Sequence, residues 1–294
     1  MILLTGASGL VGRAVLGRLT GGSVTVRCVA RDPRKLCLQD ANVEVVRGDL
    51  ADPESLRAAV RDVDVVVHLA AAIRDQPGAT IEQVSGTATA TLVDAAQEAG
   101  VRRFIFFSTL EASAQSPARF FRAKALAEQA VAGAALETII FAPSIIYAPD
   151  DPFIMLLRRL ARIPFAMPIS GSGTASYQPI WCSDVADCVI AALQWNVAQG
   201  NRFELAGPQT LTYEEIVRLV LRSAGRRRAL VHLPTPLVYR SLTMLETLAG
   251  RRAFATRDEA ELMEIPLIST RGTRDAERLG VRPQTMAAVL GLAG

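Results

Sequence analysis

The sequence predicts an α/β fold, a doubly wound parallel sheet with a small helical C-terminal lobe. Short runs rich in β-branched residues alternate with helical patterns, and this alternation is typical of βαβ units. The runs are continuously apolar, as expected for parallel strands that are buried on both faces. We expect strands at 2–5, 24–30, 43–46, 64–69, 103–107 and 138–141, with helices at 10–20, 53–61, 80–99 and 117–133.

Three of the expected helix ends carry residues that are typical of helix termini. Asp52-Pro53 and Ser116-Pro117 each place a capping side chain directly before a proline, which favours the first position of a helix. Gly100 follows the helix expected over 80–99, and glycine is the residue most often found just beyond a helix end.

The chain is expected to divide near residue 207. Residues 148–177 are rich in Pro, Gly and Ser, and we expect a substrate-loop insertion there with a short helix near 152–162. The nucleotide-binding domain, residues 1–207, includes this insertion and ends after a strand over 202–205. Residues 208–294 are expected to form the small helical lobe, with breaks at prolines, and to close over the carboxyl ends of the strands.

Composition narrows the classes of function. The 294 residues are 50% hydrophobic and 21% charged, which excludes a disordered or fibrous chain. A net charge of +3 is too small to predict nucleic-acid binding. The four Cys and two His lack metal-ligand spacing, so no metal site is expected. Neither a leader peptide nor a membrane-spanning run is expected, and the predicted location is cytoplasmic.

The first strand runs directly into a glycine-rich turn. Gly6, Gly9 and Gly12 are spaced G-x-x-G-x-x-G between a strand and a helix. This context predicts a Rossmann-type dinucleotide site, in which Gly6 makes the turn, Gly9 lets backbone approach a pyrophosphate and Gly12 lets the helix pack closely. The positive end of the helix dipole would attract the phosphates. The residues expected to contact the cofactor here are Gly6, Ser8, Gly9, Leu10, Val11, Gly12 and Arg13.

The end of the second strand bears on the choice of cofactor. Sites for NAD usually carry Asp or Glu there, to accept a hydrogen bond from the ribose 2′-hydroxyl. Here Arg31 occupies the strand end, and its guanidinium suits a 2′-phosphate, so we expect NADP in preference to NAD. Asp32 is the alternative, serving an NAD ribose if its side chain turns inward. After the third strand, Asp49 and Leu50 are expected at the adenine edge.

Seven motifs make the chain similar to a known superfamily. They are TGASGLVG at 5–12, RGDL at 47–50, VVVHLAA at 65–71, GVRRFIFFST at 100–109, APSIIYAPDD at 142–151, QPIWCSDVADCVIAAL at 178–193 and FELAGPQTLTYEEIVRLV at 203–220. On these motifs the chain resembles the atypical or extended short-chain dehydrogenases/reductases, the NAD(P)-dependent epimerase/dehydratase-like branch. The later motifs are most similar to a narrower group, the nucleotide-binding proteins related to an accessory subunit of respiratory complex I.

The resemblance implies a catalytic Ser/Thr–Tyr–Lys set, with Tyr and Lys four residues apart on one helix. Ser108 and Thr109 match the hydroxyl pair, and Lys124 matches the Lys that holds the nicotinamide ribose and lowers the pKa of the phenol. The Tyr position holds Phe120, which cannot transfer a proton. The other cofactor contacts that the resemblance implies are Leu69, Ala70, Ala71, Pro143, Ser144 and Ile145, together with Lys124.

Three functions stay open at this point. The protein is an oxidoreductase that uses another proton donor or water, a redox-silent NADP(H)-binding accessory, assembly or sensor protein, or an enzyme in which Tyr147 or Tyr177 replaces the missing phenol. We favour oxidoreduction of a small apolar carbonyl, enone or quinone-like substrate, because hydride transfer needs chiefly cofactor geometry and a dry pocket. Lys124 is one of two Lys among 32 basic residues, which favours a retained cofactor site.

The C-terminal lobe carries the features that concern partners. We expect Arg226–Arg228 to be a solvated turn rather than a nucleic-acid site, because no aromatic residues accompany it. Residues 233–252 predict an amphipathic helix with a basic end. Such a helix covers an apolar substrate pocket or contacts a membrane surface or a protein partner. The protein is expected to be a monomer or a homodimer.

Overall fold

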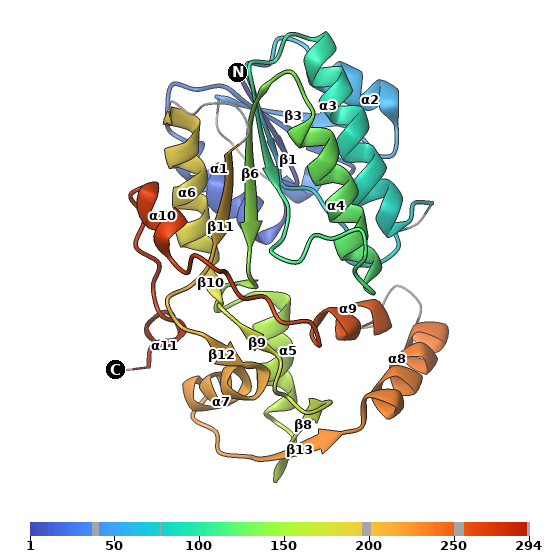
Figure 1. Cartoon of the computed structure of the whole chain (residues 1–294), viewed down its shortest axis with the longest axis vertical. Helices are drawn as coiled ribbons and strands as arrows, with labels where there is room; N and C mark the ends of the chain where they lie inside the picture. Colours follow the sequence, from blue (N-terminus) through green and yellow to red (C-terminus); the bar gives the residue numbers. More distant parts are fainter. Residues whose placement is uncertain (37–40, 77, 196–200, 250–255, 293–294) are drawn as a thin grey trace.

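A parallel seven-stranded sheet forms the centre of the molecule (Figure 1). The computed structural model describes residues 1–294 except 37–40, 77, 196–200, 250–255 and 293–294. The strand order is β11-β6-β5-β4-β1-β2-β3, and every neighbouring pair is parallel. The strands are β1 (Ile2–Thr5), β2 (Val26–Ala30), β3 (Val43–Arg47), β4 (Val65–His68), β5 (Arg103–Phe107), β6 (Glu137–Pro143) and β11 (Asn201–Leu205). The predicted doubly wound α/β fold is confirmed.

The strands bury apolar side chains on both faces of the sheet. On β1, Leu4 belongs to the core beneath one helical layer and Leu3 to the core beneath the other, and both are fully buried. Each such burial stabilises the fold by about 1.5–3 kcal/mol. The first layer contains α1 (Leu10–Leu19) and α6 (Cys182–Gln194), and the second contains α2 (Pro53–Ala59), α3 (Ala88–Glu98) and α4 (Arg119–Ala132).

The helix expected over 80–99 is confirmed, but it contains a π-helical turn. Residues Gln83–Thr87 form a π-helical turn, and α3 begins only after it. Gly86 lies in this wide turn, where a Cβ atom would approach the Ala123 carbonyl oxygen of α4 to 3.3 Å. The Ser85 hydroxyl hydrogen-bonds both the N–H and the carbonyl of Ala72. The turn therefore joins α4 to the loop that follows β4, a link that the apolar periodicity did not indicate.

Two of the three expected helix ends are confirmed. Asp52 caps α2 by accepting from the Glu54 N–H, and Gly100 has φ +74 just beyond α3. The end expected at Ser116-Pro117 is wrong, because α4 begins two residues later at Arg119. The Arg122 guanidinium donates to the carbonyls of Ser116 and Pro117, which holds them outside the helix.

The described chain beyond residue 208 is mainly helical, as expected, but it also contains strands that the sequence did not predict. Strand β13 (Ala229–Leu233) pairs in parallel with β8 (Ala166–Ser170), and β12 (Leu211–Thr212) pairs with β9 (Ser176–Tyr177). Their partners lie in the segment expected to be the insertion, so no local pattern predicted the pairing. Strand β7 (Ile146–Tyr147) pairs with β10 (Ile180–Trp181), and the remaining helices are η1 (Pro33–Leu36), α5 (Pro152–Leu160), α7 (Tyr213–Ser223), α8 (Thr235–Ala249), α9 (Arg257–Leu262), α10 (Arg274–Arg278) and α11 (Met286–Val289).

The lobe below the sheet and the sheet itself are joined by the C-terminal segment (Figure 1). Ala276 of α10 and the following Leu279 pack in the core shared by α1 and α6. The domain boundary at residue 207 stays a prediction. Among the helices of the described chain, none combines the length and apolar character needed to span a bilayer.

We predict that Gly12→Ala destabilises the protein by about 1–3 kcal/mol, because a Cβ there would lie 2.1 Å from the Gly6 carbonyl oxygen. Gly17→Ala on the same helix is the matched control. Its Cβ meets nothing within 4 Å, so it should stabilise by about 0.5–1 kcal/mol through helix propensity. Urea unfolding monitored by circular dichroism measures both, and equal effects from the two variants would contradict the close packing.

Candidate functional site

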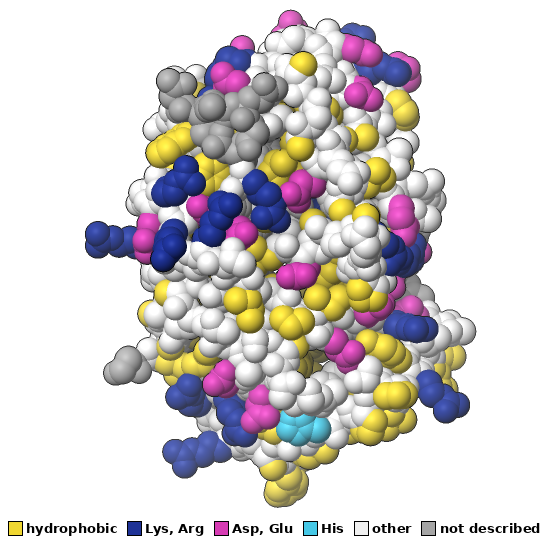
Figure 2. Space-filling view, in the orientation of Figure 1, with side chains coloured by type: hydrophobic (Ala, Val, Ile, Leu, Met, Phe, Trp, Pro, Cys, Tyr) yellow, Lys and Arg dark blue, Asp and Glu magenta, His cyan; other side chains and the backbone are white. Residues whose placement is uncertain are grey.

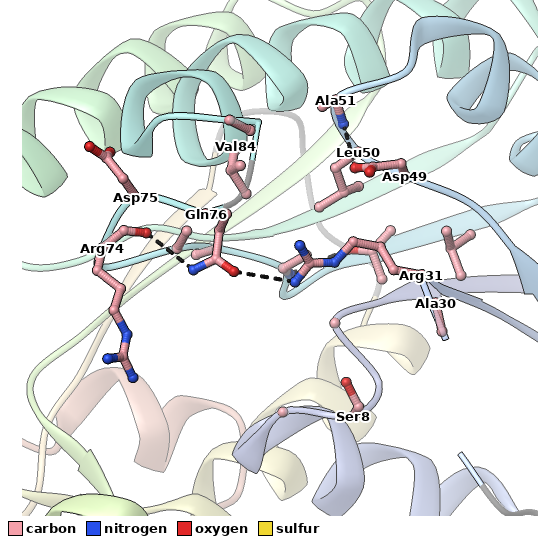
Figure 3. A pocket seen from close by; sticks show the side chains of 18 of the residues that line it. Ser8, Ala30, Arg31, Asp49, Leu50, Ala51, Arg74, Asp75, Gln76 and Val84 are labelled. Atoms are coloured by element: carbon pink, nitrogen blue, oxygen red, sulfur yellow. Dashed lines mark hydrogen bonds between the residues drawn. The ribbon is translucent and has the colours of Figure 1, made fainter. Parts of the chain in front are cut away.

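A cavity of about 1110 Å³ lies at the carboxyl ends of β1, β2, β3 and β4. In an open parallel sheet this is the usual place for a ligand. The cavity contains residues that the sequence predicted for a cofactor, namely Gly6, Ser8, Gly9, Arg31, Asp49, Leu50, Leu69, Ala70 and Ala71. Figure 3 shows side chains from the ends of different strands facing this common space.

The phosphate loop forms one wall of the cavity. Gly6 has φ +72, and a Cβ there would lie 2.7 Å from the Ala70 N–H nitrogen. Gly9 donates its N–H to the Gly6 carbonyl at 2.9 Å and stands at the N-cap of α1, without a side-chain cap. The first N–H groups of α1 are thus left for another acceptor, which fits the pyrophosphate of a dinucleotide.

The β2 end presents an exposed arginine to the cavity. Arg31 Nη2 donates to Gln76 Oε1 at 3.4 Å, and the two side chains point toward each other in Figure 3. Asp32 Oδ1 accepts from the Arg34 N–H at 3.2 Å, so one carboxylate oxygen is engaged in the turn. Arg13 donates to the Ser8 carbonyl at 2.8 Å and braces the phosphate loop.

Other predicted site residues do not line the cavity. These are Leu10, Val11, Gly12 and Arg13 of α1, Ser108, Thr109 and Lys124, Pro143 at the end of β6, and Ser144 and Ile145 after it. Ser144 is buried, donates to the Leu267 carbonyl at 2.7 Å and accepts from the Gln178 N–H. Asp49, which does line the cavity, accepts from the Ala51 N–H at 3.0 Å, so its carboxylate also orders the loop after β3.

Lys124 is buried beside the end of β5. Its Nζ donates to the Phe107 carbonyl at 2.5 Å and lies 4.8 Å from the ring centre of Phe106 and 5.7 Å from that of Phe120. Burial lowers the pKa of the Lys124 ammonium to about 7, and the Glu128 carboxylate opposes that shift. Burial, followed by the charge on Lys124, lowers the pKa of His68 to about 3, so this imidazole is neutral at physiological pH.

The two hydroxyls after β5 are oriented differently. Ser108 Oγ donates to Glu128 Oε2 at 2.5 Å, and Glu128 Oε1 accepts from Arg202 Nε at 2.6 Å. The Ser108 hydroxyl thus hydrogen-bonds the Glu128 carboxylate, which is itself paired with Arg202. The Thr109 side chain is buried, and within the part of the chain that the structure describes it makes no side-chain hydrogen bond. Of these two hydroxyls, Thr109 is thus the one not engaged by another side chain, although it does not line the cavity.

Both tyrosines considered as substitutes for the missing phenol are buried away from the cavity. The Tyr177 hydroxyl donates to the Met263 carbonyl. The Tyr147 hydroxyl has no hydrogen-bond partner among the described residues. Burial raises the pKa of each phenol above its usual range, which makes both poor proton donors at neutral pH.

Sequence reasoning missed one part of the cavity wall. The cavity is also lined by Glu246 of α8 and by Thr256 and Asp258 at the start of α9; we call these three residues the roof. The spacing Thr256-x-x-Glu259, a capping box in the structure, could have revealed the start of α9. Nothing in the local sequence could have placed that helix over the cavity.

Arg119 at the start of α4 connects the roof to α4 and to the segment that follows β4. Its guanidinium contacts Asp75, Glu82 and, at 3.7 Å, Asp258. The hydrogen bond from Arg119 lowers the pKa of Glu82 to about 2, so that carboxylate stays charged across the physiological range. Among the described residues, no group of three or more His, Cys, Asp or Glu side chains is arranged to hold a metal ion, and Cys37 lies outside the described residues.

Sequence comparison relates the chain to a family and to named proteins. The NmrA-like family model matches residues 1–289. Mouse mitochondrial NADH dehydrogenase (ubiquinone) 1 alpha subcomplex subunit 9 is 30% identical over 287 residues, 95% of this chain and 75% of the mouse protein. Its Arabidopsis thaliana counterpart is 31% identical, and the chain spans 60% of its length. Ceramide reductase of Caulobacter vibrioides is 29% identical over 80% of this chain and 74% of the reductase.

Structural comparison supports the same fold. A nucleoside-diphosphate-sugar epimerase of Staphylococcus aureus superposes with a TM-score of 0.75 over 98% of this chain and 99% of the epimerase, at 19% identity. MoeE5, in complex with UDP-glucuronic acid and NAD, superposes with a TM-score of 0.73 over 99% of this chain and 96% of MoeE5, at 21% identity. The predicted resemblance to epimerase/dehydratase-like proteins and to a complex I accessory subunit is confirmed.

We predict that Lys124 makes stability rise with pH between about 7 and 10.5. In this window the unfolded lysine holds a proton that the folded one has lost, so raising the pH favours the folded state by up to about 1.4 kcal/mol per pH unit. Urea unfolding at several pH values should show this slope as the difference between the wild type and Lys124→Met. A difference that does not change with pH would contradict the lowered pKa.

Proposed function

The chain belongs to the NmrA-like family, and we propose that it binds NADP(H) and acts as an oxidoreductase on a small apolar carbonyl, enone or quinone-like substrate. The observation that carries the proposal is the cavity at the strand ends, which joins the phosphate loop to the exposed Arg31. Gly6 and Gly9 would receive the pyrophosphate, Asp49 the adenine and Arg31 the 2′-phosphate. The named substrate of the Caulobacter relative, ceramide, is consistent with an apolar substrate class.

The proton is the difficult part of the proposed chemistry. A bound nicotinamide would supply the hydride. Phe120 has no acidic hydrogen, but the Lys124 ammonium, whose pKa burial lowers to about 7, lies 5.7 Å from the centre of the Phe120 ring. We assign Lys124 as the acid: it protonates the oxygen of a carbonyl that gains hydride at carbon, becomes a neutral amine and regains its proton from solvent. Thr109 would orient the substrate oxygen.

The second candidate is a redox-silent NADP(H)-binding accessory protein. The loss of the phenol at Phe120 and the complex I subunits among the relatives favour it. Leu237, Met244 and Leu248 on α8 are exposed, spaced along one side of the helix, and would suit an apolar contact with a protein partner. Because those relatives are mitochondrial, the cytoplasmic location stays a prediction.

We predict that Arg31→Ala weakens binding of NADPH by about tenfold to a hundredfold and leaves NADH binding nearly unchanged, because one charged contact to phosphate is lost. Titration of the purified protein with each reduced nucleotide, followed by nucleotide fluorescence, measures both affinities. Arg74→Ala is the matched control, since Arg74 also lines the cavity but pairs with Glu259. If Arg31→Ala binds NADPH as tightly as the wild type does, Arg31 does not contact the 2′-phosphate.

We predict that kcat with NADPH and an apolar aldehyde, enone or quinone falls as the pH rises above about 7, following loss of the Lys124 proton. Lys124→Met should abolish turnover while nucleotide still binds.

Phe120→Tyr should raise kcat by about tenfold or more, because a phenol restores the general acid. Phe120→Leu, which adds no proton donor, is its control. Stoichiometric nucleotide binding without turnover in the wild type or in Phe120→Tyr would favour the silent accessory protein.

A further inference from the structure

The lower lobe contains an unusual concentration of positive charge. Residues 152–183 and 216–245 together carry nine Arg and no Asp or Glu, in a chain whose net charge is only +3. The nine are Arg158, Arg159, Arg162, Arg218, Arg222, Arg226, Arg227, Arg228 and Arg240. The rest of the chain is consequently net negative. Apart from Cys182 and Ser183, which begin α6, both acid-free stretches belong to the lobe below the sheet, where Glu214 pairs with Arg218.

Strand pairing brings part of this charge together at one end of the lobe. Strands β8 and β13 are parallel, so the segments that precede them meet at the same end. The Ala229 N–H donates to the Phe165 carbonyl at 3.2 Å, and Arg228 Nε donates to the Ile163 carbonyl at 2.9 Å. We call residues 162–165 and 226–231 the basic tip. In Figures 1 and 2 this end of the β8–β13 pair lies at the bottom of the molecule, where hydrophobic side chains extend lower than the basic ones.

The basic tip ends in an exposed aromatic residue on a strained turn. The Phe165 side chain is 88% exposed. Its φ is +69, and the Ala166 N–H donates to the Pro164 carbonyl at 2.9 Å, which makes Phe165 the centre of a γ-turn. A γ-turn with positive φ is rare and strained for any residue with a side chain, and glycine would adopt it without that cost. Ile163 and Val231 beside it are each 44% exposed.

The backbone strain at Phe165 and the exposed apolar side chains beside it do not stabilise the free protein. We therefore infer that the basic tip contacts a partner. The arginines provide charge complementarity to phosphate groups. Nucleic acid offers phosphate too, and a base can stack on Phe165, but such sites usually present several aromatic side chains, whereas here Phe165 is accompanied by the aliphatic Ile163 and Val231. An anionic lipid surface offers both features, with phosphates at its face and hydrocarbon behind them.

We propose that the basic tip docks on anionic lipid membranes, with Phe165 and Ile163 inserted at the boundary of headgroups and acyl chains and Arg162 and Arg226–Arg228 on the lipid phosphates. The contact is peripheral. It uses none of the residues assigned to the nucleotide cavity, so it holds whether or not the proposed oxidoreductase function is correct.

Cosedimentation of the full-length chain with vesicles tests the proposal. The wild type should bind vesicles of equimolar phosphatidylglycerol and phosphatidylcholine, and should be released by salt and bind poorly to phosphatidylcholine alone. Arg226→Gln, Arg227→Gln and Arg228→Gln should each lower the partition coefficient by about fivefold. The matched control is Arg61→Gln, which removes an exposed arginine of the sheet domain and should leave binding unchanged.

The variant Phe165→Gly distinguishes a loss of membrane binding from a loss of folding. Glycine accepts φ +69 without strain, so the variant should melt at or above the wild-type temperature while its partition coefficient falls by about tenfold or more. Leu126→Ala, which trims a side chain 49% exposed on α4, is the apolar control and should bind like the wild type. The proposal is overturned if the wild type does not bind anionic vesicles, if Phe165→Gly binds them as well as the wild type does, or if an RNA oligonucleotide binds the tip in their place.

Discussion

The architecture depends on how closely the first helix approaches the first strand. At Gly12 the backbone of α1 lies so near the Gly6 carbonyl that even a methyl group would collide with it. At Gly6 the loop passes just as closely over Ala70, after β4. These two contacts fix where α1 begins and so where its unbonded N–H groups point. They also bring the ends of neighbouring strands to one wall, and the cavity between them follows from that geometry.

A second constraint is the buried amine of Lys124. Burying an ammonium costs free energy, and here the Phe107 carbonyl, two aromatic rings and the charge of Glu128 offset only part of that cost. Burial, followed by the charge on Lys124, lowers the pKa of His68 and keeps its imidazole neutral between the Thr5 and Thr89 hydroxyls. Thirty of the 32 basic residues are arginine. Position 124 nevertheless holds a lysine, which is destabilising there but can lose its proton near neutral pH. This choice favours a chemical role over a purely structural one.

The parts that sequence predicted well are those set by neighbours in the chain. The apolar runs predicted the central strands, and the glycine spacing predicted the turn from β1 into α1. Both features are determined by residues that are close together in the sequence. The pairing of β13 with β8, the roof and the turn of Ser108 toward Glu128 depend on segments far apart in sequence. The Tyr147 hydroxyl, which has no hydrogen-bond partner in the described part of the chain, belongs to the same class, because only tertiary packing decides whether a buried phenol finds an acceptor.

The lower lobe links the two ends of the molecule. Its α8 and α9 supply the roof, connected to α4 through Arg119, while its β8–β13 pair carries the basic tip. An apolar substrate of the proposed class concentrates in lipid rather than in water. An enzyme docked by this tip would meet that substrate at its highest local concentration, while the nucleotide would bind at the opposite, sheet-facing side of the lobe. Docking would then be a property of the lower lobe, and catalysis would take place where the roof meets the sheet domain, with the Arg119–Asp258 contact joining the two parts.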